Sequence, residues 1–100
     1  MIEEHIIILE EGLLGVRSIP NQLRNDRFFD NKQFVKVIES LKILITLFKD
    51  RQSVPKRLSL CFVDISNYFF VDDRYFDSHE INKIEDAGMK LSELANKLFS

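Results

Sequence analysis

The chain has 100 residues, of which 45% are hydrophobic and 30% are charged, and its formal net charge at pH 7 is −2. This length suits one domain and excludes two, and the composition excludes a disordered chain, which would need fewer apolar residues and a larger net charge. The single cysteine, Cys61, excludes an intramolecular disulfide and a zinc site built from cysteines.

The first predicted element begins at Ile2. Its apolar residues recur at spacings of four and three, which is typical of one face of a helix: Ile2, Ile6, Leu9, Leu13 and Val16. The triple isoleucine at residues 6–8 favours a strand by propensity, but the longer periodicity predicts a helix that Gly15 and Pro20 end. Ser18, just before Pro20, is suited to cap a short helical turn.

The most regular helical pattern follows Asp30 and Asn31, either of which is a good N-cap. Apolar residues again alternate at spacings of four and three, and charged residues occupy the other faces, so we predict a helix that ends near Asp50. The apolar positions are Phe34, Ile38, Leu41, Ile45 and Phe48.

Residues 58–71 allow two interpretations. Leu58, Phe62, Ile65 and Phe69 have helical spacing. The alternative is a β-hairpin with strands 58–63 and 68–71, because the segment is rich in aromatic and β-branched residues. We favour the helix because the other elements are helical. Cys61 has apolar neighbours, so we expect a buried thiol that packs as a small hydrophobic group.

Residues 71–77 break the pattern and predict a loop. Asp77 followed by Glu80 resembles a capping box, which indicates the start of a last helix. Gly88 and Ala95 lie on the apolar face of that helix and would let another helix approach closely. The sequence therefore predicts one all-α domain over residues 1–100, an antiparallel bundle of about four main helices.

The N-terminal residues lack the positive region of a signal peptide, and the longest unbroken apolar runs are four residues, far short of a membrane span. We therefore expect a cytoplasmic protein with no membrane partner. The abundance of Ile, Lys, Asn and Phe suggests a bacterial coding sequence of low GC content.

Charge is segregated along the chain. Residues 1–16 carry four glutamates and no Lys or Arg, residues 17–57 carry ten basic and four acidic residues, and residues 58–82 carry five acidic residues and one arginine. This arrangement is compatible with attraction between acidic and basic elements within the fold, and equally with an acidic face on one side.

The sequence shows no motif for a metal, a cofactor or a catalytic group. His79-Glu80 starts a metalloprotease-like pattern, but the second histidine that this pattern needs four residues after the first is absent. Three glycines cannot supply a glycine-rich phosphate loop. We therefore expect no cofactor, no metal ligand and no catalytic residue.

One short pattern favours an enzyme as the alternative. Arg74 and His79 are separated by four residues, which resembles the signature of the all-α HEPN superfamily, many members of which are ribonucleases. The resemblance implies that His79 would help to activate a ribose 2′-hydroxyl and that Arg74 would stabilise the phosphate in a metal-independent cleavage of RNA.

A basic stretch with interleaved aromatics covers residues 24–36. Arg24, Arg27, Lys32 and Lys36 flank Phe28 and Phe29, a composition that nucleic-acid interfaces use. Such an interface usually belongs to a basic domain, whereas this chain is slightly acidic. We therefore expect this stretch to compensate the charge of the two acidic segments rather than to bind nucleic acid.

The most distinctive segment is residues 64–77, where aromatic rings alternate with carboxylates. Aromatic residues anchor interfaces because they bury a large rigid area, and carboxylates around them steer a basic partner. An alternative is that Phe69 and Phe70 enter the core and leave a solvated acidic loop. The predicted partner-binding residues are Asp64, Tyr68, Asp72, Asp73, Tyr75, Phe76 and Asp77.

In size, charge and layout the chain resembles the bacterial immunity proteins of the colicin type and of contact-dependent growth inhibition. The resemblance implies that acidic carboxylates around exposed tyrosines would occupy a basic nuclease toxin. The sequence therefore predicts a non-enzymatic protein-binding domain, with toxin immunity as its most specific form.

Overall fold

The computed structural model describes residues 1–65 and 67–100. Its helices are α1 (Ile2–Leu13), α2 (Ile19–Asn25), α3 (Asn31–Phe48), α4 (Lys56–Leu60), α5 (Ile65–Tyr68) and α6 (Ser78–Phe99), and the described residues contain no β-strand. The predicted all-α fold is confirmed. No helix in this part of the chain is both long enough and apolar enough to cross a membrane.

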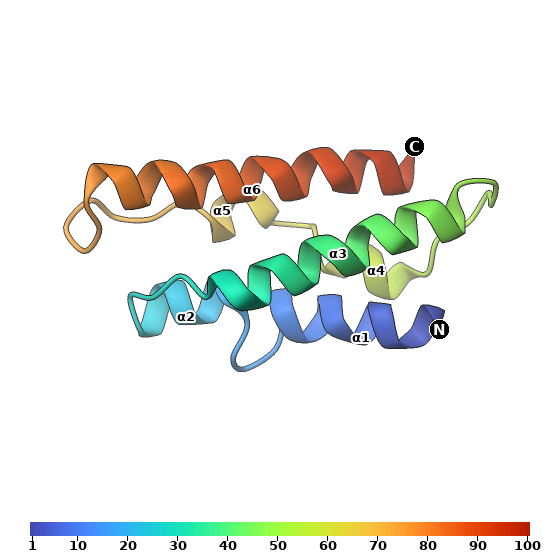
Figure 1. Cartoon of the computed structure of the whole chain (residues 1–100), viewed down its shortest axis with the longest axis horizontal. Helices are drawn as coiled ribbons and strands as arrows, with labels where there is room; N and C mark the ends of the chain where they lie inside the picture. Colours follow the sequence, from blue (N-terminus) through green and yellow to red (C-terminus); the bar gives the residue numbers. More distant parts are fainter.

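Successive segments of the chain run in opposite directions (Figure 1). α1 starts at the end of the molecule where both termini lie, and α3 returns alongside it. The segment with α4 and α5 then runs back, so that α6 points in the same direction as α3. The result is an elongated antiparallel bundle of 44 × 23 × 20 Å whose third segment is irregular.

Three helices begin at capping residues that the sequence indicated. The Ser18 hydroxyl accepts a hydrogen bond from the backbone N–H three residues later at 3.4 Å, and the Asp30 carboxylate does the same for α3 at 3.1 Å. Asp77 and Glu80 form a reciprocal capping box, with distances of 2.8 and 3.3 Å. These side chains satisfy backbone donors that a helix start otherwise leaves without partners.

Residues 58–71 form neither one helix nor a hairpin. The backbone N–H groups of Cys61 and Phe62 each bond the carbonyl three residues earlier, at 3.1 Å, which tightens the chain at the end of α4 and interrupts it before α5. Leu58, Cys61, Ile65 and Phe69 are nevertheless buried. An inward apolar stripe is present, as predicted, but the helix that carries it is divided at residues 61–64.

One hydrophobic core runs the length of the bundle, and every helix contributes to it. Its buried members are Ile6, Leu9, Leu13, Ile19, Leu23, Val37, Leu41, Leu44, Phe48, Leu58, Cys61, Ile65, Phe69, Phe76, Ile84, Ala87, Leu91, Leu94 and Leu98. The predicted stripes supply Ile6, Leu9 and Leu13 from α1 and Leu41 and Phe48 from α3. Phe34, Ile38 and Ile45 are only partly buried, because Val37 and Leu44 also face the core, and Val16 lies beyond α1 and is exposed.

Two glycines allow close packing between segments. A Cβ atom added at Gly88 would lie only 2.7 Å from the Cβ of Phe69, which is nearer than real Cβ atoms approach other heavy atoms. A Cβ atom added at Gly12 in α1 would likewise come too close to the side chain of Val37 in α3. The expected narrow groove at Gly88 is therefore filled by the chain itself.

The segregated charges are partly paired within the fold. The Arg57 guanidinium on α4 binds Glu3 and Glu10 on α1, with N–O distances of 2.7 and 2.6 Å. The hydrogen bond from Arg57 lowers the pKa of the Glu10 carboxyl, and the same contacts raise the pKa of Arg57. The basic segment that contains Arg57 thus forms ion pairs with the acidic N-terminal helix.

Candidate functional site

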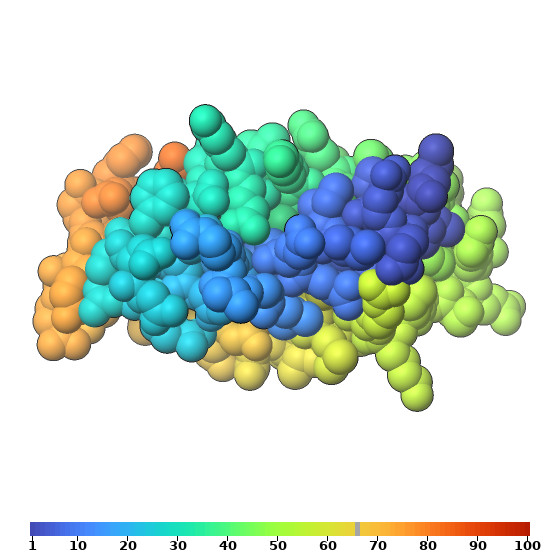
Figure 2. All heavy atoms as spheres, turned by 90° about the horizontal axis from the view of Figure 1, so that it is seen from below, coloured from blue at the N-terminus to red at the C-terminus, as the bar shows by residue number. Residues whose placement is uncertain are grey.

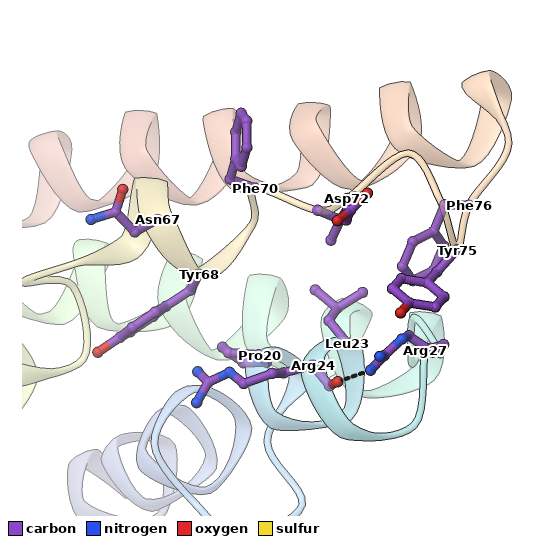
Figure 3. A pocket seen from close by; sticks show the side chains of 11 residues that line it. Pro20, Leu23, Arg24, Arg27, Asn67, Tyr68, Phe70, Asp72, Tyr75 and Phe76 are labelled. Carbon is purple, nitrogen blue, oxygen red and sulfur yellow. Dashed lines mark hydrogen bonds between the residues drawn. The ribbon is translucent and has the colours of Figure 1, made fainter.

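A cleft opens between α2 and the segment that follows α5. It has a volume of about 260 Å³. We call it the aromatic–arginine cleft, and its lining residues are Pro20, Leu23, Arg24, Arg27, Asn67, Tyr68, Phe70, Val71, Asp72, Tyr75 and Phe76 (Figure 3). In the space-filling view the loop before α6, in orange, lies beside the cyan end of α2 at one end of the molecule (Figure 2). Two segments about fifty residues apart in sequence therefore build one surface.

The two walls meet where Arg27 stacks on Tyr75. The guanidinium carbon lies 3.9 Å from the centre of the ring, which is a close cation–π contact. The Arg27 guanidinium also donates to the backbone carbonyl of Arg24 (Figure 3). Half of the Tyr75 side chain remains exposed, at 50%. The stack holds a large amphipathic ring at the surface in a fixed orientation.

Arg27 adopts an unusual backbone conformation for its residue type. Its φ angle is +53°, and it is the one non-glycine residue with positive φ in the described chain. It follows the C-cap of α2, a position where glycine is common. Left-handed backbone costs an L-residue about 1–2 kcal/mol. Arg27 thus occupies a position whose backbone favours glycine, and its side chain lines the cleft.

Phe76 and Asp77 hold the loop rather than extend from it. Phe76 lines the cleft but is only 7% exposed and belongs to the core, so it anchors the loop and offers little surface to a partner. Asp77 accepts the capping hydrogen bond at the start of α6. The buried ring and the cap fix Tyr75 from its C-terminal side.

Asp72 is tied to Arg74 on the loop. Its carboxylate accepts from the Arg74 guanidinium at 2.7 Å and from the Arg74 backbone N–H at 2.9 Å. These hydrogen bonds lower the pKa of Asp72 to about 2 and raise the pKa of Arg74. The loop is therefore stiffened by a short-range ion pair, and part of its predicted negative charge is neutralised.

The structure brings together only some of the predicted binding residues. Tyr68, Asp72, Tyr75 and the largely buried Phe76 line the cleft, whereas Asp64, Asp73 and Asp77 are exposed outside it. Of the described residues that line the cleft, Asp72 is the sole carboxylate, and it faces Arg24 and Arg27 on the other wall. The cleft is thus of mixed charge, and the free acidic groups lie at its margin.

Phe70 is a surface residue that the sequence did not identify as a contact. It is 75% exposed and lies at the edge of the cleft, with its ring pointing toward α6 (Figure 3). Phe69, its neighbour, is fully inside the fold at 2%. The helical spacing of Leu58, Ile65 and Phe69 predicted that Phe69 faces inward, and this is confirmed, whereas Phe70 lies at the surface and not in the core.

Arg24 and Arg27 were predicted as part of a basic stretch that pairs with the acidic segments, without a named partner for either arginine. The fold divides that stretch between two faces. Arg24 and Arg27 line the aromatic–arginine cleft, while Lys32 and Lys36 line a separate groove between α1 and α3. No single basic stripe therefore runs over the four residues.

Arg74 and His79 do not line a common pocket in the described structure. Arg74 is engaged with Asp72, and its side chain is otherwise directed to solvent, at 74% exposure. His79 is exposed in the first turn of α6 and lines a shallow pocket with Arg27, Phe29 and Lys83.

Cys61 is buried between α4 and α5, as expected. Burial raises the pKa of its thiol to about 11, so the reactive thiolate is scarce near neutral pH. The side chain donates weakly to the backbone carbonyl of Arg57 at 3.6 Å. Its contribution is to packing.

Comparison with known proteins gives no match: no family model, no curated protein and no solved structure matches this chain.

Proposed function

We propose that the protein is a non-enzymatic binding domain that recognises another protein through the aromatic–arginine cleft and its exposed rim. The observation that carries this proposal is the stack of Arg27 on a half-exposed Tyr75, with Tyr68 and Phe70 nearby. Tyrosine and arginine are the residue types most enriched in interface hot spots. The site concentrates them on one small surface.

The size of the cleft also favours a protein partner. Its volume of about 260 Å³ lies below the roughly 300–1,000 Å³ of typical small-molecule sites. A cleft of this size accommodates a protruding side chain. Tyr75 and Phe70, which stand at its edge, would then make the surrounding contacts.

Preorganisation supports the same function. The Asp72–Arg74 ion pair, the buried Phe76 and the Asp77 cap restrict the loop before any partner arrives. Ordering a loop or a side chain on binding costs about 0.5–1.5 kcal/mol for each immobilised side chain. A loop that is already ordered avoids much of this cost.

In its most specific form the proposal is toxin immunity, with a basic nuclease toxin as partner. The support for it is the exposed position of Asp64 and Asp73, neither of which forms an ion pair in the described part of the chain. Such carboxylates would accelerate association with a basic surface. Arg24 and Arg27 would require matching acceptors on that partner.

The alternative is a small HEPN-like ribonuclease, or a related toxin–antitoxin component, that uses Arg74 and His79. The ribonuclease form is the one that can be tested on the purified protein. It predicts metal-independent RNA cleavage by the purified protein, and loss of that cleavage in His79→Ala. The separation of the two side chains into different surroundings favours the binding function over this alternative.

The proposed function can be tested by photo-crosslinking from inside the native host. A photoreactive phenylalanine analogue replaces Tyr75 in one variant and Val16 in a control, because Val16 is 91% exposed and lies outside the cleft. We expect one protein to be captured from position 75 and not from position 16. For toxin immunity, that protein must be a basic nuclease whose activity the unmodified chain suppresses.

Two results would contradict the proposal. Equal capture from both positions would show that position 75 is not a specific contact. RNA cleavage by the parent that disappears in His79→Ala would favour the enzymatic alternative.

A further inference from the structure

A second groove runs along α6, between this helix and the segment that carries α4 and α5. Two adjoining hollows of about 510 and 310 Å³ share Ser92 and Asn96, so they form one continuous depression, which we call the α6 groove. One wall is α6 from Glu85 to Phe99, and the other is the segment that carries α4 and α5. This groove is distinct from the aromatic–arginine cleft, with only Phe70 at the boundary of both.

Three exposed apolar side chains line the α6 groove. Phe70 is 75% exposed, Val63 71% and Met89 60%, and all three line it. Contiguous apolar side chains at the surface of a small protein are a sign of an interaction site. Methionine adds an adaptable contact that fits irregular partners.

The floor of the groove is rigid. Phe69 is packed directly on Gly88, where no side chain could be inserted without moving the backbone or the ring. This close approach brings the end of α5 against α6 and leaves Phe70 standing above the surface. The same packing that buries Phe69 therefore creates the apolar wall.

The charges of the α6 groove are all negative among the described residues that line it. They are Glu85 and Glu93, both exposed on α6 and absent from the ion pairs of the described chain. Eight residues of α-helix separate them, which is about 12 Å. A partner that docks here must bring positive charge at a similar spacing.

We infer that the α6 groove is a docking site for a basic amphipathic helix of a partner protein. From Glu85 to Phe99 the wall is about 21 Å long, enough for roughly four helical turns. A helix with an apolar stripe would contact Phe70, Val63 and Met89, and lysines or arginines about two turns apart would face the glutamates. This inference does not depend on the aromatic–arginine cleft.

The test uses a fluorescent synthetic peptide of about 15 residues, matched to the length of the groove. The peptide is helical, with a leucine stripe and lysines on its flanks. One control peptide carries glutamates in place of the lysines, and another has the same composition in an order that disperses the stripe. Fluorescence anisotropy measures Kd for the whole chain at low and moderate salt.

Two groove variants probe the two kinds of contact. Phe70→Ala/Met89→Ala removes apolar area, and we expect Kd to rise about tenfold or more. Glu85→Gln/Glu93→Gln removes charge, and we expect weaker binding at low salt together with a smaller salt dependence. All four side chains are exposed, so the variants should keep the parental melting temperature.

Matched controls lie on the opposite face. Val16→Ala removes an exposed apolar side chain, and Glu11→Gln/Glu39→Gln removes two exposed glutamates from the groove between α1 and α3. The inference requires unchanged Kd in both controls and weak binding of both control peptides.

Three outcomes would overturn the inference. The first is no binding of the lysine peptide, or equal binding of the dispersed one. The second is loss of binding in the Glu11/Glu39 control, which would place the peptide between α1 and α3. The third is a dimer of the parent, seen by sedimentation, that Phe70→Ala/Met89→Ala abolishes, because a second copy would then be the occupant.

Discussion

Phe69 and Phe70 are adjacent in sequence, and the structure predicts opposite consequences for their replacement by alanine. Phe69 is 2% exposed and packs on Gly88, whereas Phe70 is 75% exposed. Truncating a buried phenylalanine leaves a cavity and typically costs about 3–5 kcal/mol. Truncating an exposed one usually changes stability by no more than about 0.5 kcal/mol.

These magnitudes are large relative to the whole stability of a domain, which is about 5–15 kcal/mol. We therefore expect Phe69→Ala to lower the urea midpoint strongly, or to prevent folding at ambient temperature. For a domain of this size each kcal/mol corresponds to a shift of roughly 4–8 °C in Tm. Phe70→Ala should melt within a few degrees of the parent.

The assay is urea and thermal unfolding followed by far-ultraviolet circular dichroism. Phe69→Leu provides a partial control, because it refills much of the cavity and should recover part of the lost stability. Equal losses in Phe69→Ala and Phe70→Ala, or a larger loss in Phe70→Ala, would refute the packing of α5 on α6 described above.

Three further predictions follow from named contacts. Gly88→Ala should lower Tm although alanine has the higher helix propensity, because its Cβ would collide with Phe69; an unchanged or higher Tm would contradict the close approach. The pKa of Glu10 is lower in the folded than in the unfolded protein, so its ionised form stabilises the fold. This stabilisation is fully present above the carboxyl's unfolded pKa, about 4.3, and is lost as pH falls through the lower folded pKa. Arg57→Met should thus destabilise the protein at neutral pH and progressively less in acid. Urea titrations from pH 7 to pH 2 measure this. A difference in unfolding free energy between parent and variant that stays constant with pH would argue against the ion pair. Cys61 should react with iodoacetamide at pH 8 far more slowly in the native state than in urea, since the thiol is buried and its pKa is raised to about 11. Similar rates in both states would contradict the burial of the thiol.

The helical periodicities and the caps were predictable because both are local. Ser18, Asp30 and Asp77 cap helices through hydrogen bonds to backbone only three residues away, so the sequence itself contains both partners. The interruption at residues 61–64 was not predictable in the same way. It depends on packing the end of α5 against Gly88, a contact between segments about twenty residues apart.

The candidate site shows the same division. Tyr75 was identified because aromatic residues among carboxylates in a loop are a recognisable composition. The burial of Phe76 was not predicted, because an irregular loop has no periodicity from which burial can be inferred; it belongs to the core and also lines the cleft. The contact of Arg27 with Tyr75 was not predicted, because it joins the end of α2 to a loop nearly fifty residues later.

The most direct test of the proposed binding function is the affinity of the captured partner for Tyr75→Ala and Arg27→Gly, measured by calorimetry beside Val16→Ala. We predict that Kd rises roughly 30-fold for Tyr75→Ala, which corresponds to about 2 kcal/mol. Arg27→Gly should bind more weakly too, while its Tm stays level or rises, because glycine relieves the positive φ. Val16→Ala should bind like the parent. Unchanged Kd in both cleft variants, with the partner still bound tightly, would contradict the assignment of the aromatic–arginine cleft as the interface.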